Sequence, residues 1–101
     1  MILSQRTQFL NFKPTDGFQL YTDALIGNLL NLAPSDATGL SMIEKRGERY
    51  SCKIEITSAI GRFEAFIEGF SARSALEEAR RRIIRQLSKW RRQRFAFTGS
   101  A

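Results

Sequence analysis

Hydrophobic and polar residues alternate along several short stretches of the chain and recur at helical spacing along two longer ones. Residues 2–12, 40–46, 49–57 and 63–68 have the extended patterns that predict strands, and alternation is cleanest in 49–57. Tight turns are predicted at 46–48 and at 61–62. Apolar residues spaced three and four apart predict helices over 15–32 and from 72 to about 94. The predicted order is β-α-β-β-β-α.

One face of each predicted element is apolar and is expected to point inward. Thr15 or Asp16 is expected to cap the first helix, and Ser71 the second. In the strands over 49–57 and 63–68, the inward residues are expected to be Tyr50, Cys52, Ile54, Ile56, Phe63, Ala65 and Ile67. In the two helices they are expected to be Phe18, Tyr21, Leu25, Leu29 and Leu32, and Ala72, Leu76, Ala79, Ile83, Leu87 and Trp90.

This order of elements restricts the fold to an α+β architecture. A β-α-β start predicts a right-handed crossover between parallel strands, and the two hairpins then add antiparallel strands. Both helices are expected to cover one face of a four-stranded mixed sheet, which makes a two-layer sandwich. The 101 residues are expected to form a single domain, with a folded core over 1–95 and a flexible tail over 96–101.

Few residues suited to catalysis are present. The chain contains no histidine, and its one cysteine, Cys52, occupies an inward strand position where a buried, unreactive thiol is expected. Lys53 and Arg62 are expected to pair across the strands with the outward carboxylates Glu55, Glu64 and Glu68. We therefore predict a protein that is not an enzyme and that holds neither metal nor cofactor.

The sequence also bears on location. No apolar stretch approaches the roughly 20 residues of a membrane-spanning helix. The first residues lack the layout of a signal peptide. A cytoplasmic protein without a membrane partner is expected.

Positive charge is concentrated at one end of the chain. Of the net charge of +6, residues 1–70 contribute seven cations and eight acids, whereas residues 71–101 contribute nine cations and two acids. Such a local field attracts polyanions, first of all nucleic acid and secondly an anionic membrane surface, although a basic helix can also serve only solubility. At about 100° per residue, one helix face, opposite the apolar stripe, presents the candidate phosphate-binding residues Arg81, Arg82, Arg85, Lys89 and Arg92.

The element order, together with the segment Arg85-Gln86-Leu87-Ser88-Lys89, resembles the ribosome hibernation promoting factor family, also called protein Y or sigma-54 modulation proteins. The resemblance covers nearly the whole chain and is best over 43–94. It implies a fold similar to a double-stranded-RNA-binding domain with an extra first strand. It also implies a short-type factor that occupies the mRNA and tRNA channel of the small ribosomal subunit and silences translation. The family places basic side chains of its second helix on the rRNA, and the resemblance implies that the matching positions here are Arg82, Arg85 and Lys89. Arg81 and Arg92 are added as candidates from helical geometry alone.

The first helix departs from this family, because residues 15–34 contain no Lys or Arg where rRNA contacts are usual. Leu20, Ile26 and Leu30 are expected to form an exposed apolar face there, suited to a protein partner or a homodimer. Two alternatives therefore stand beside ribosome binding. One is a protein-interaction module that has lost the ribosome. The other is a generic double-stranded-RNA module, although residues 71–74 carry only one cation, Arg73.

Overall fold

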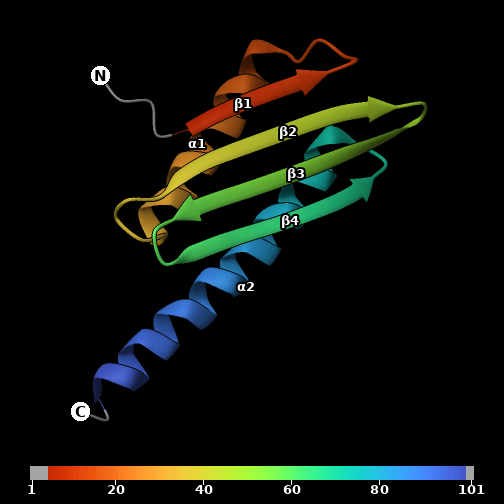
Figure 1. Cartoon of the computed structure of the whole chain (residues 1–101). Coiled ribbons are helices and arrows are strands. Elements are labelled where there is room, and N and C mark those ends of the chain that lie inside the picture. The colour runs from red at the N-terminus through yellow and green to blue at the C-terminus, as the bar shows by residue number, and fades with distance from the viewer. Residues whose placement is uncertain (1–4, 100–101) are drawn as a thin grey trace.

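The structure is a computed structural model that describes the backbone of residues 5–99 and the side chains of residues 5–93. Its elements follow the predicted order β-α-β-β-β-α (Figure 1). They are β1 (Gln5–Leu10), α1 (Asp16–Leu32), β2 (Thr38–Arg46), β3 (Arg49–Ser58), β4 (Gly61–Gly69) and α2 (Ala72–Gly99).

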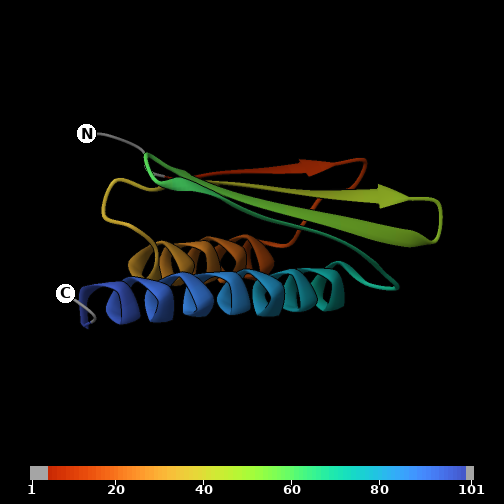
Figure 2. The same ribbon diagram turned by 60° about the horizontal axis from the view of Figure 1, so that its bottom comes forward.

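The four strands form one mixed sheet in the order β1-β2-β3-β4. β1 pairs with β2 in parallel, and β2–β3 and β3–β4 pair antiparallel. Both helices lie on the same face of this sheet, as Figure 2 shows. The predicted α+β two-layer sandwich is confirmed.

Several boundaries differ from the predicted ones. β1 ends at Leu10, before Asn11, whose φ of 66° departs from extended backbone; residues 2–4 of the predicted strand lie outside the described residues. The second hairpin turns at 59–60, and Gly61 already belongs to β4. α2 continues to Gly99, so its backbone includes part of the segment predicted as a flexible tail; residues 100–101 lie outside the described range.

Both helices begin where the sequence predicts. The Thr15 hydroxyl accepts a hydrogen bond from the Phe18 backbone N–H at 3.1 Å. The Ser71 hydroxyl accepts one from the Ser74 N–H at 3.0 Å. Each bond satisfies an N–H that has no partner inside its helix, which sets the first turn.

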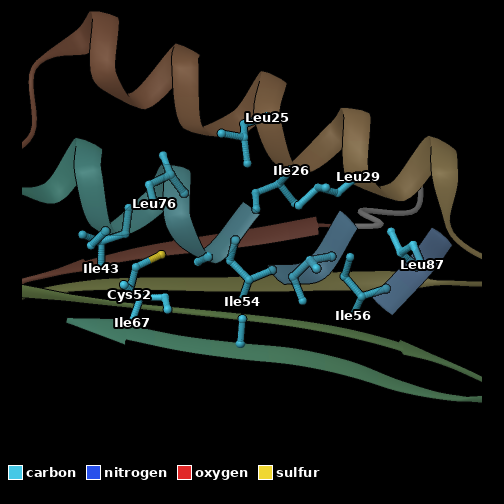
Figure 3. Close-up of a cluster of buried hydrophobic side chains, with 14 of the residues drawn as sticks. Leu25, Ile26, Leu29, Ile43, Cys52, Ile54, Ile56, Ile67, Leu76 and Leu87 are labelled. Atoms are coloured by element: carbon cyan, nitrogen blue, oxygen red, sulfur yellow. The ribbon is translucent and has the colours of Figure 1, made fainter. Parts of the chain in front are cut away.

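The hydrophobic core fills the space between the helices and the sheet (Figure 3). α1 covers β1 and β2, whereas α2 covers β3 and β4. The alternation predicted for β3 and β4 and the apolar stripe of α2 are confirmed. In the predicted apolar stripe of α1, the exception is Leu32 at the end of the helix, which has 37% of its surface exposed. The buried hydrophobic residues from the two best strands and the second helix are Cys52, Ile54, Ile56, Ala65, Ile67, Ala75, Leu76, Ala79, Ile83 and Leu87.

The prediction of an exposed apolar face on α1 was wrong for Ile26. This side chain is fully buried, Leu30 is partly buried, and only Leu20 remains open, with 71% exposed. The reason is Gly39 on β2, where an added Cβ would lie 3.2 Å from Ile26 Cγ2 and 3.4 Å from Leu30 Cδ2. The bare backbone lets α1 approach the sheet so closely that Leu25 and Ile26 are both buried.

Candidate nucleic-acid interface on helix α2

The orientation of α2 is fixed by the residues that it buries. Leu76, Ile83 and Leu87 are at most 1% exposed against the sheet. Further along, the Trp90 ring packs edge-on against Phe63, with 6.2 Å between ring centroids. Because this stripe faces the sheet, the opposite face of α2 must point into solvent.

Polar contacts hold α2 in the same orientation. The Gln86 amide exchanges two hydrogen bonds with the backbone of Glu64 on β4, at 2.7 and 3.0 Å. Gln86 lies within the segment that carries the family resemblance, but its role as a link to β4 was missed. Sequence spacing does not show that the Glu64 backbone lies within its reach, because this depends on how α2 packs against β4.

The structure brings the five predicted cations together on the solvent face of α2, where all are exposed. They fall within an arc of about 100° and span about 16 Å along the axis. Arg81 pairs with Glu78 on the preceding turn. Of these five cations, Arg82, Arg85, Lys89 and Arg92 form no ion pair with any described residue.

This arrangement suits a polyanion. Guanidinium groups bind phosphates through forked N–H donors, and four charges without internal partners need not break an ion pair to do so. The row is long enough to contact several phosphates along one backbone.

The surface of α1 is different in kind. No Lys or Arg occurs between residues 15 and 34. The exposed side chains there include Gln19, Asp23 and Asn28, and Asp23 accepts a hydrogen bond from Thr7 at 3.4 Å. The electropositive surface is therefore carried by α2 and not shared between the helices.

The other candidate reactive groups are either buried or paired with a neighbouring charge. Burial raises the pKa of the Cys52 thiol from 9.0 to about 12, so the thiolate is disfavoured at neutral pH. Glu55 pairs with Lys53 at 3.6 Å and with Arg62 at 3.5 Å, and Arg62 also lies 3.9 Å from Glu64. Among the described residues, no cluster of three acidic, cysteine or histidine side chains could hold a metal. No described helix is long and apolar enough to span a membrane.

A second group of arginines lies at the start of α2 and was not predicted as a site. The Arg49 guanidinium sits 4.9 Å from the centre of the Phe70 ring. Arg73, singled out only as the lone cation of its segment, lies 4.6 Å from the centre of the Tyr21 ring. The pairing of Tyr50 with Gly69 brings Arg49 next to Phe70, and sequence spacing alone does not reveal it.

Comparison with known proteins finds structures with the same fold but no match by sequence. No protein-family model and no curated protein matches the chain. The Thermus thermophilus protein Y N-terminal domain superposes with a TM-score of 0.73 at 16% identity, covering 89% of this chain and 99% of that domain. A ribosomal subunit interface protein from Coxiella burnetii gives 0.71 at 10% identity, covering 86% and 96%. The chain thus has the fold of these two proteins, which is the fold implied by its resemblance to the hibernation factor family.

Proposed function

We propose that the protein is a ribosome-associated factor of the cytoplasm that silences translation by binding small-subunit rRNA through the basic face of α2. It acts by occupying the mRNA and tRNA channel, as the family resemblance implies, and physical occlusion requires no chemical step. The observation that carries the proposal is the row of exposed cations from Arg81 to Arg92, on a fold shared with a protein Y domain and with a ribosomal subunit interface protein.

The uneven distribution of charge defines how the protein would bind. Since α1 offers no cation, the phosphate contacts come from α2, and α1 serves as a scaffold that holds the sheet and α2 in place. The generic double-stranded-RNA alternative receives less support, because residues 71–74 at the start of α2 carry a single cation, Arg73. A protein-interaction module that uses the predicted face of α1 also receives less support, because Ile26 is buried, Leu30 is partly buried and, of the three predicted residues, Leu20 alone is exposed.

Co-sedimentation with purified small ribosomal subunits across a salt series tests the proposal. Five phosphate contacts predict a log–log salt slope of about −3.5 to −4.5. The variant with Arg82, Arg85 and Lys89 all changed to Glu is expected to lose subunit binding while keeping its circular dichroism spectrum.

A matched control changes three exposed cations outside α2, Arg6, Lys13 and Lys45, to Glu. It alters the net charge equally and is expected to bind subunits nearly as the wild type does. Retained binding by the α2 variant, or equal loss in both variants, would refute a site on α2.

A further inference from the structure

Phe70 is exposed in a way that the core does not explain. It lies between β4 and α2 with 81% of its surface exposed, more than any other large hydrophobic side chain in the described part of the chain. Arg49 covers one face of its ring at 4.9 Å. With so much of the ring exposed, the opposite face is open to solvent.

This ring borders a hollow, which we name the Phe70 hollow, at the junction of β4 and α2. Two of its arginines, Arg49 and Arg73, lie over aromatic rings and form no ion pair among the described residues. Arg81 also lines it and belongs to the basic face of α2. The hollow is therefore continuous with the proposed RNA-binding surface.

Acidic side chains in the hollow limit where a phosphate can sit. Glu78 is neutralised by Arg81, and Glu77 lies 3.9 Å from Arg80. Glu68 on β4 has no ion pair within the described part of the chain. A phosphate is thus favoured near α2, and an uncharged group is favoured near β4.

We propose that Phe70 is a stacking platform for an unpaired base of bound RNA. The base lies on the open face of the ring, Arg49 supports the ring from the other face, and Arg73, which forms no ion pair among the described residues, faces the adjoining phosphate. Aromatic rings accept any base in this way, and an adjacent arginine strengthens the stack. The inference rests on the proposed function and adds to it a contact with single-stranded RNA, outside the α2 row.

The test compares Phe70→Leu, which keeps an apolar side chain but removes the aromatic face, with Phe66→Leu. Phe66 is the matched control, a half-exposed phenylalanine on the open face of the sheet. Binding is measured to small ribosomal subunits by co-sedimentation. It is also measured by fluorescence anisotropy to a labelled single-stranded 12-nucleotide RNA and to a 12-base-pair RNA duplex.

Phe70→Leu is expected to weaken binding to the single-stranded RNA and to subunits about tenfold, with an unchanged salt slope and unchanged duplex binding. Phe66→Leu is expected to match the wild type. Equal affinities for Phe70→Leu and wild type, or equal losses in both variants, overturn the stacking site. If the triple α2 variant alone then loses subunit binding, the proposed function stands without the stacking site. If the wild type does not bind subunits but Phe70→Leu selectively weakens single-stranded RNA binding, the platform stands and the ribosomal function fails.

Discussion

The side-chain amide of Gln86 binds the backbone of Glu64 as a neighbouring strand would. Its Oε1 accepts from the Glu64 N–H at 3.0 Å, and its Nε2 donates to the Glu64 carbonyl at 2.7 Å. Because β4 is an edge strand, these backbone groups would otherwise be open to pairing with another chain. One side chain thus protects the sheet edge and helps to fix the rotation of α2.

Replacing Gln86 by Leu should therefore destabilise the fold. The change keeps a side chain of similar size and removes two partly solvated hydrogen bonds, so a loss of about 1–2 kcal/mol in the free energy of unfolding is expected. Urea denaturation measures it. Gln93→Leu, an exposed glutamine on the same helix, is the control and should change little. Equal midpoints for the two variants would contradict a structural role of the Gln86 amide.

The close approach of α1 to β2 predicts that Gly39 does not tolerate a side chain. Gly39→Ala places a Cβ 3.2 Å from Ile26 Cγ2 and should cost about 1–3 kcal/mol. Adding Ile26→Leu, which removes that branch, should recover part of the loss, as a double-mutant cycle by denaturation would show. Gly17→Ala, in α1 with open space around it, should leave stability unchanged or raise it. If the effects of Gly39→Ala and Ile26→Leu on the free energy of unfolding simply add, the two residues are not in contact.

The buried thiol predicts a loss of stability at alkaline pH. Cys52 has its pKa raised by burial from 9.0 to about 12. Between these values the unfolded chain releases this proton while the folded chain keeps it. The free energy of unfolding therefore falls as pH rises, by about 1.4 kcal/mol per pH unit from this group. Cys52→Ala should lack this component when both proteins are denatured in urea between pH 8.5 and 10.5. If the free energy of unfolding falls with pH equally in Cys52→Ala and in the wild type, the thiol does not contribute.

Each phosphate contact on α2 should contribute separately to the salt dependence. Arg85→Ala is expected to make the log–log slope for subunit binding less steep by about 0.7–0.9, because one fewer counterion site is neutralised. Arg6→Ala, an exposed cation on β1, should leave the slope unchanged. A slope unaffected by Arg85→Ala would remove that residue from the interface.

Periodicity was sufficient to predict most of the fold. The alternation around Cys52 and the helical spacing from Leu76 to Leu87 both reflect burial against a single layer, and they predicted the correct faces. The placement of Ile26 failed because periodicity assumes a helix that buries one stripe. How closely a helix approaches the sheet depends on the strand opposite, here on Gly39.

The candidate site could be predicted only where it follows one helix. The row from Arg81 to Arg92 depends on helical spacing alone, so the sequence was enough to bring it together. Arg49 begins β3 and Phe70 follows the end of β4, so the register of these two strands brings the two residues together. The link between Gln86 and Glu64 likewise requires the packing of α2 against an edge strand.

The continuity of α2 gives the molecule a preorganised spacing. Phe70 lies two residues before the helix, and Arg92 lies about 30 Å along the axis from the first helical residue at 1.5 Å per residue. Since the helix between them is packed on the sheet over most of this length, the two ends cannot adjust to each other. If Phe70 and α2 bind RNA as proposed, an RNA that already holds an unpaired base and a phosphate at that separation binds without rearrangement, whereas a flexible strand must lose conformational entropy to do so. Selectivity would then follow the three-dimensional shape of the RNA rather than its base sequence.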